Sequence, residues 1–148
     1  MQQLDKLAQY LGEIETAMNL MVKNLGFHYN HYAVLYCLAS SKDNQVTQKQ
    51  ISEEWSLPKQ TVFNICQDYK QKGWILFQES PKDKREKILQ LTDLGNQQAM
   101  PVLYATQAVS QQVFQRFGSQ KTQQLFALLQ EFSESYTQVL SQIEHKNN

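Results

Sequence analysis

The middle of the chain, residues 47–95, carries a series of local signals that few folds can accommodate. Thr47-Gln48-Lys49-Gln50 is a capping box, in which the threonine hydroxyl and the Gln50 side chain each satisfy a free backbone N–H. A short helix is expected to run from there to about Trp55. Pro58 suits the first position of a second helix, since its missing N–H would have no helical partner there. The pattern therefore predicts two helices joined by a tight turn.

The second helix should bury one face and leave the other exposed. Its apolar residues recur at three- and four-residue steps: Val62, Ile65, Cys66 and Tyr69. Gly73 ends the helix, and residues 74–77 predict the first strand of a hairpin that residues 87–91 complete. The loop between them is strongly basic. This order of helix, turn, helix and basic hairpin predicts a winged helix-turn-helix.

Long helices are predicted on both sides of this segment. Apolar residues at helical spacing predict helices over residues 4–25 and 30–40, then from Thr92 to about Phe117, and one more capped by Ser119. The last helix has the longest apolar stripe: Leu125, Leu128, Leu129, Phe132, Tyr136, Val139, Leu140 and Ile143. The predicted fold is mainly α with a small β-hairpin wing. It is a single domain, 1–148, in three parts: N-terminal dimerisation and core helices 1–41, a winged lobe 42–95 and C-terminal dimerisation helices 96–148.

The terminal helices carry more apolar surface than a module of about 50 residues could cover. Leaving such surface in water costs about 25 cal/mol per Å². The simplest solution is a homodimer in which the terminal helices of two copies pack together. Two-fold symmetry would then present two recognition helices about 34–36 Å apart, which is one turn of DNA.

The distribution of charge points to a local site. The chain has 14 basic and 14 acidic residues, so its formal net charge is zero. Between Pro58 and Gln90, however, seven Lys or Arg stand against four acids. A basic patch on a neutral protein is typical of a defined nucleic-acid site rather than of general polyanion binding.

Several classes of function lack support in the sequence. There is no Gly-rich phosphate loop, Gly-x-Ser-x-Gly elbow or His-Glu-x-x-His motif, so neither an enzyme nor a cofactor is expected. His28 and His31 lack a third ligand nearby, so no metal site is expected. No apolar run approaches the roughly 18 residues of a membrane span, and the N-terminus lacks a secretory signal. These features favour a cytoplasmic protein.

The winged segment resembles the MarR (multiple antibiotic resistance regulator) family of transcription factors. The resemblance rests on Leu57-Pro58-Lys59-Gln60-Thr61-Val62, on Gly73-Trp74-Ile75, and on Asp83-x-Arg85 followed by Leu89-x-Leu91-Thr92-x-x-Gly95. The flanking helices match the family layout, so the resemblance covers nearly the whole chain. It implies a homodimeric regulator, usually a repressor, that binds a pseudo-palindromic operator in double-stranded DNA. Release by a small aromatic effector or by oxidation is common in the family.

The resemblance also assigns roles to residues. Lys59, Gln60, Thr61 and Asn64 are expected in the major groove, where Gln and Asn can pair with adenine. Arg85 is expected in the minor groove, oriented by Asp83. The remaining wing cations are expected on phosphates: Lys82, Lys84 and Lys87.

Phe63 departs from the small polar residue that is usual at its position in the family. Two interpretations stay open: contact with a thymine methyl group, or packing beneath the wing.

A ligand pocket and the cysteines complete the expectations. The resemblance places an effector pocket where the dimer helices meet the winged lobe, with these candidates: Met18, His31, Tyr32 and Tyr36. Cys37 and Cys66 fall on inward stripes, where a thiol acts as a small hydrophobe of low reactivity.

A second class of function remains open. The alternative to a DNA-binding regulator is a winged-helix module for protein–protein interaction without sequence-specific DNA binding. The weak overall charge and Phe63 are the features that favour it.

Overall fold

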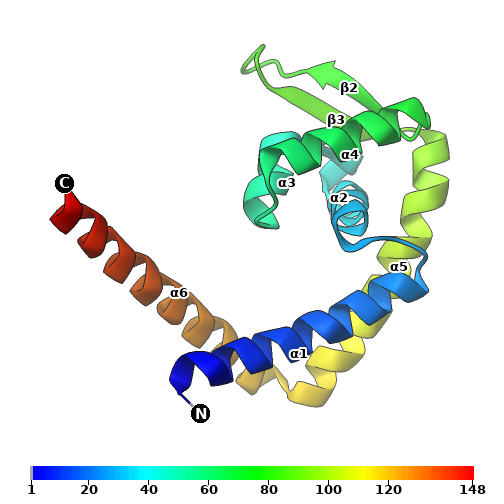
Figure 1. The fold of residues 1–148 in the computed structure, drawn as a ribbon. Helices are drawn as coiled ribbons and strands as arrows, with labels where there is room; N and C mark the ends of the chain where they lie inside the picture. The colour runs from blue at the N-terminus through cyan, green and yellow to red at the C-terminus, as the bar shows by residue number, and fades with distance from the viewer. Residues whose placement is uncertain (1) are drawn as a thin grey trace. The chain divides into compact units, whose positions relative to one another are not determined.

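The computed structural model describes residues 2–148 and confirms a mainly helical fold with a small sheet. The elements in chain order are α1 (Gln3–Asn24), α2 (Tyr29–Ser40), a 3-10 turn (Lys42–Asn44), β1 (Gln45–Thr47), α3 (Gln48–Glu54), α4 (Lys59–Gln71), β2 (Ile75–Glu79), β3 (Lys87–Leu91), α5 (Asp93–Phe117) and α6 (Ser119–Asn147). In Figure 1 the β2–β3 hairpin lies against the group formed by α2, α3 and α4. This is the winged helix-turn-helix that the sequence predicts.

The sheet has three antiparallel strands in the order β1-β3-β2. The predicted second strand of the hairpin is confirmed, and Ile75 faces Leu91 across it. The short strand β1 was not predicted, because three residues are too few to show an alternating pattern. Val46 of β1 pairs with Leu89 and is buried, so this strand attaches the start of α3 to the wing.

The junction between the wing and α5 explains the Leu-x-Leu-Thr-x-x-Gly string. Thr92 Oγ1 donates to the carbonyl of Gly73 and accepts from the N–H of Gly95, which confirms Thr92 as the cap of α5. A Cβ at position 95 would lie 2.0 Å from the Trp74 carbonyl oxygen, so only glycine fits there. The residues of this string thus attach the base of the wing to the start of α5.

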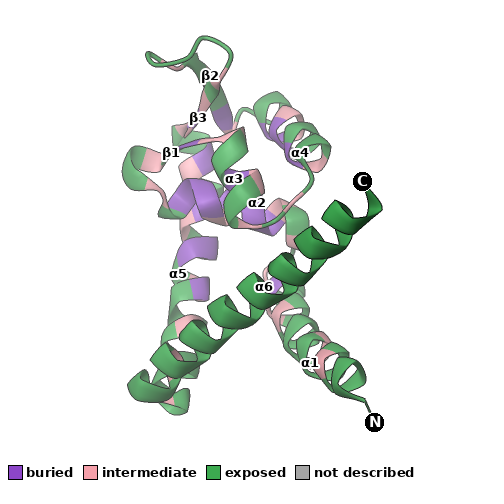
Figure 2. Ribbon diagram, turned by 90° about the vertical axis from the view of Figure 1, so that its left-hand side faces the viewer, coloured by how far each residue is buried: buried purple, intermediate pink, exposed green. Residues whose placement is uncertain are grey.

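The chain forms two compact units, one extending through Ala105 and the other covering Thr106–Asn148. The core of the first unit is built by α2, α4, the sheet and the start of α5, where buried residues concentrate (Figure 2). Its largest fully buried side chains are Tyr32, Tyr69, Leu35, Leu38, Ile51, Ile75, Leu89, Val22, Val34, Val62 and Cys66. Among described residues 2–148, no helix is long and apolar enough to cross a membrane.

The second unit contains the end of α5 and all of α6. Gly118 turns the chain between them with a φ of 105°, and the rings of Phe114 and Phe126 meet edge to face at 5.8 Å. No residue of α6 is buried (Figure 2). The apolar stripe predicted for this helix is present but uncovered.

Two predicted helix starts are wrong by one residue. Pro58 precedes α4 as its N-cap and is not its first helical residue, because its ψ of 139° is extended. Ser119 is the first residue of α6, and Gly118 takes the N-cap position. α5 runs as one helix through Pro101.

Candidate nucleic-acid interface

The α4 helix presents one polar face because its opposite face is anchored in the core. Val62, Ile65, Cys66 and Tyr69 are all buried, which confirms the predicted inward stripe. The Tyr69 hydroxyl also donates a 2.7 Å hydrogen bond to the backbone carbonyl of His31 on α2. The helix therefore cannot rotate about its axis without breaking both contacts, and its outward face is fixed.

The outward face carries the side chains predicted to read bases. Lys59, Gln60 and Asn64 are exposed, and Thr61 is half-buried. Gln60 Nε2 donates to Asn64 Oδ1 at 2.9 Å, a pairing that the four-residue helical spacing allows. Asn64 keeps both of its N–H donors free of this bond, and Gln60 keeps its carbonyl oxygen. The hydrogen-bonded pair thus offers the Gln60 carbonyl oxygen as an acceptor and the remaining amide N–H groups as donors.

The wing tip is organised around Asp83. Its carboxylate Oδ1 accepts from the Arg85 backbone N–H at 2.9 Å and lies 3.5 Å from Arg85 Nε. The Arg85 side chain is 94% exposed, so the guanidinium extends into solvent while its base is held. This geometry fits the predicted role of Asp83 as the residue that orients Arg85.

The remaining wing cations divide into two groups. Lys82 and Lys84 are exposed at the tip. Lys87 lies over the ring of Phe77 at 5.6 Å, and Lys70 of α4 lies over the same ring at 4.8 Å. Phe77 thus holds two ammonium groups between the wing and the recognition helix through cation–π attraction.

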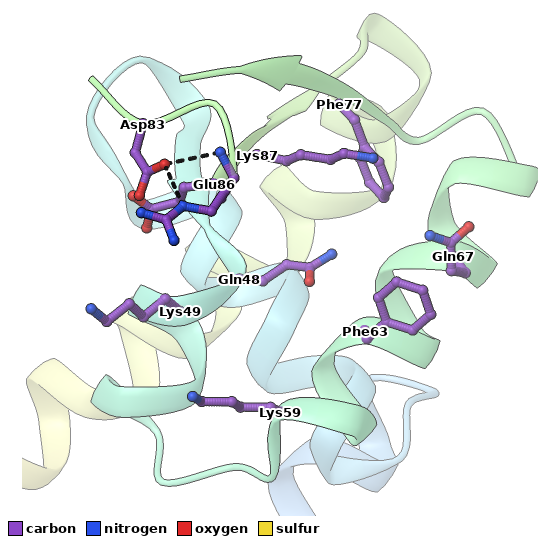
Figure 3. Close-up of a pocket in the computed structure, with 10 residues that line it drawn as sticks. Gln48, Lys49, Lys59, Phe63, Gln67, Phe77, Asp83, Glu86 and Lys87 are labelled. Atoms are coloured by element: carbon purple, nitrogen blue, oxygen red, sulfur yellow. Dashed lines mark hydrogen bonds and ion pairs between the residues drawn. The ribbon is translucent and has the colours of Figure 1, made fainter. Parts of the chain in front are cut away.

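A hollow of about 450 Å³ separates α4 from the wing. Figure 3 shows side chains from α3, α4 and the hairpin around it: Gln48, Lys49, Lys59, Phe63, Gln67, Phe77, Asp83, Glu86 and Lys87, together with Arg85. Four of these side chains are cationic and two are carboxylates, so the hollow has a net charge of +2. Four of the nine predicted DNA-contacting residues line this hollow: Lys59, Phe63, Arg85 and Lys87.

Five of the lining residues are not among the predicted site residues: Gln48, Lys49, Gln67, Phe77 and Glu86. The positions of Gln48, Lys49 and Phe77 depend on how α3 and β2 pack beside α4, which helical spacing does not reveal. Gln67 follows Phe63 by one turn on the outward face of α4, and this spacing is a signal that could have found it.

Phe63 lies on the wall of this hollow and outside the core. Its relative exposure is 44%, and it is absent from the residues that pack against the core, whereas Phe77 is among them. The two aromatic residues of the hollow therefore differ: Phe77 supports the wing, and Phe63 faces outward from α4 (Figure 3).

The candidates for an effector pocket do not form one cluster in the first unit. His31 lines a second hollow, of about 370 Å³, together with other residues of α2 and α4: His28, Tyr29, Asn30, Thr61, Asn64 and Ile65. Tyr32 is 1% exposed and packs against Tyr36 and Trp55 with ring centroids 6.0 and 6.3 Å away. Met18 is half-buried on α1. Burial lowers the pKa of His31, although Asp68 lies 3.9 Å from its Nε2 and opposes that effect.

Both cysteines are buried, as predicted. Burial raises the pKa of the Cys37 and Cys66 thiols to about 12, so both are neutral at physiological pH. A neutral buried thiol is a poor nucleophile. Within residues 2–148, no cluster of three or more His, Cys, Asp or Glu side chains could hold a metal ion.

Fold and site together define a winged helix-turn-helix protein with a basic, polar recognition face. Residues 25–86 match the model of the MarR family. Over nearly its whole length the chain is similar to NMB1585, a MarR family regulator from Neisseria meningitidis: the two are 37% identical, the match covers 96% of this chain and 99% of the other, and the TM-score is 0.87. The chain belongs to the MarR family.

More distant structures share the fold. MepR from S. aureus, solved in complex with DNA, is 16% identical with a TM-score of 0.68 over 91% of this chain and 98% of its own. CouR from Rhodococcus jostii RHA1, bound to p-coumaroyl-CoA, is 20% identical with a TM-score of 0.67 over 85% and 87% of the two chains. No curated protein sequence matches the chain.

Proposed function

We propose that the protein is a homodimeric transcriptional repressor that binds a pseudo-palindromic operator in double-stranded DNA. The observation that carries the proposal is the convergence of α4 and the wing on one hollow with a net charge of +2. Membership of a family of regulators and the DNA complex of MepR support it. The DNA partner implies a cytoplasmic location.

In this proposal, α4 enters the major groove and the wing reaches the neighbouring minor groove. Lys59, Gln60, Thr61 and Asn64 contact base edges, with the Gln60–Asn64 pair offering the donor and acceptor that an adenine edge requires. Arg85 enters the minor groove, where narrow A·T tracts concentrate negative potential. The lysines of the wing bind phosphates and fix the register: Lys82, Lys84 and Lys87, joined by Lys49 of α3.

The homodimer is supported by the exposed apolar surface of the terminal helices. α6 has a continuous uncovered stripe, and on α1 the exposed apolar residues include Leu4, Tyr10, Leu11, Ile14 and Leu20. Exposed apolar surface on this scale marks an interaction site. If two copies packed about a two-fold axis through these helices, each copy would direct its recognition helix to one of two successive half-sites.

Release of the operator by a small aromatic effector is part of the same proposal. The hollow beside His31 opens between α2 and the recognition helix, so a ligand there would act directly on the position of α4. The p-coumaroyl-CoA complex of CouR, which shares the fold, supports this part of the proposal.

The test is selection of bound duplexes from a random library at near-physiological salt. An enriched inverted repeat with half-sites about one helical turn apart is the expected result. Salt-sensitive binding without enrichment would contradict the proposal and favour the alternative, a winged-helix module that binds a protein partner.

A further inference from the structure

Phe63 is an aromatic side chain that lies outside the core. It lies on the outward face of α4, is 44% exposed, and takes no part in the core cluster. The exposed part of its ring could be covered by a partner, which would be favourable because it removes apolar surface from water. Its surroundings indicate what it meets in a complex.

Helical spacing places Phe63 within the set of polar side chains that face outward. Gln60 lies three residues before it and Asn64 directly after it, and these two are hydrogen-bonded to one another. Lys59 and Gln67, four residues to either side, line the same hollow as Phe63 (Figure 3). The ring is therefore bordered by groups that bind base edges and phosphates.

We infer that Phe63 is a specificity-determining residue that contacts the C5-methyl group of a thymine in the major groove. The methyl group is the one apolar feature on the major-groove edge of a base pair, and aromatic or aliphatic contact is how proteins recognise it. The cationic lining of the hollow selects a polyanionic partner, which makes DNA rather than an apolar peptide the occupant of this face. The inference rests on the proposed function and adds to it the chemical identity of one base.

The two interpretations that the sequence left open are separated by the neighbouring Phe77. Packing beneath the wing is the role of Phe77, which belongs to the partly buried residues around the core and carries two lysines on its ring. Phe63 lies across the hollow from it, on the recognition helix. The hollow lies between the two rings and Phe63 is 44% exposed, so its ring is available to the groove.

The experiment replaces each thymine of the selected operator by deoxyuridine, which removes only the methyl group, and measures affinity by fluorescence anisotropy. One symmetry-related position in each half-site should weaken wild-type binding about fourfold per methyl group, the effect of one buried carbon. Phe63→Ala should bind thymine and deoxyuridine equally at that position. Leu76→Ala removes another exposed apolar side chain, from β2 of the same lobe, and should keep the fourfold preference.

A second arm replaces the T·A pair by a C·G pair that carries either cytosine or 5-methylcytosine. If the methyl group alone is read, 5-methylcytosine should bind more tightly than cytosine by the same factor. Wild-type protein that binds the operator but ignores every thymine-to-uracil change would overturn the inference and leave the proposed function intact. A Phe63→Ala variant that keeps the preference for thymine would overturn it in the same way. Failure to select any operator would remove the proposed function, and this inference with it.

Discussion

The helices α2 and α6 both carry many apolar residues and have opposite environments. α2 has 12 residues, of which seven are buried, while α6 has 29 residues and none is buried. The apolar residues of α2 lie on most sides of the helix, whereas those of α6 form one stripe. α2 has α1, α4 and the sheet packed around it within one chain, and the stripe of α6 remains in contact with solvent.

This contrast shows what an apolar stripe predicts. The stripe indicates that a face will be covered, but it does not say whether the covering surface comes from the same chain. For α6, exposed apolar side chains extend from Leu125 to Ile143, along most of the helix. The proposed homodimer is the interpretation in which a second copy supplies the missing cover.

The largest expected effect comes from placing charge on that stripe. Leu129→Glu combined with Phe132→Glu should raise the dissociation constant of the dimer by about a thousandfold, roughly 4 kcal/mol, because each copy would bury two unpaired charges. Sedimentation velocity over a range of concentrations measures this. As a control, Gln138→Glu adds one negative charge per chain on the opposite side of α6 and should leave the dimer intact.

The next largest effect is expected when a leucine is shortened to alanine in each of the two helices, α2 and α6. Leu38→Ala should lower the free energy of unfolding by about 2–5 kcal/mol, because it leaves a cavity in the core of the first unit. Leu128 lies on the α6 stripe, and its side chain is 63% exposed. Leu128→Ala should therefore lower stability by weakening the association of two copies. Urea unfolding at several protein concentrations separates them: the effect of Leu128→Ala should change with concentration. If Leu128→Ala lowers the free energy of unfolding by the same amount at every protein concentration, the contacts of Leu128 lie within one chain.

The two arginines of the chain allow a matched comparison of function. Arg85 is on the wing and Arg116 is near the end of α5. Arg85→Ala should weaken operator binding by about 1–3 kcal/mol without lowering the melting temperature, because its side chain is 94% exposed in the free protein. Arg116→Ala should leave affinity unchanged. Equal behaviour of the two variants would remove the wing from the mechanism.

The smallest expected effect is a pH dependence at the interface of α2 and α4. Burial lowers the pKa of His31 from 6.5, so the unfolded chain binds more protons than the folded chain below that pH. The stability contributed by neutral His31 is therefore present above pH 6.5 and is lost as the pH falls through the folded-state value. His31→Gln should flatten this part of the stability profile in urea titrations.

Local chemistry explains which features could be predicted. The capping box at Thr47, the inward stripe of α4 and the cap at Thr92 each depend on residues close in sequence, and all are confirmed. The lining of the hollow by Gln48 and Phe77 depends on packing between elements, which no local pattern encodes.

The ambiguity over Phe63 had the same origin. Its neighbours along the chain do not show which aromatic residue packs against the core beneath the wing, and the structure gives that place to Phe77. Tyr32, a candidate for the effector pocket, is buried in the core at 1% exposure, and its role toward a ligand stays a prediction.

The most direct test compares the affinity of the protein for a palindromic operator with its affinity for a single half-site. The result depends on both the winged lobe and the α6 stripe. The wild-type protein should bind the palindrome far more tightly, because the proposed homodimer would deliver two recognition helices together. The Leu129→Glu, Phe132→Glu variant should bind both duplexes weakly and about equally. If that variant is monomeric and still binds the palindrome as tightly as the wild type, the proposed link between the α6 stripe and operator recognition is wrong.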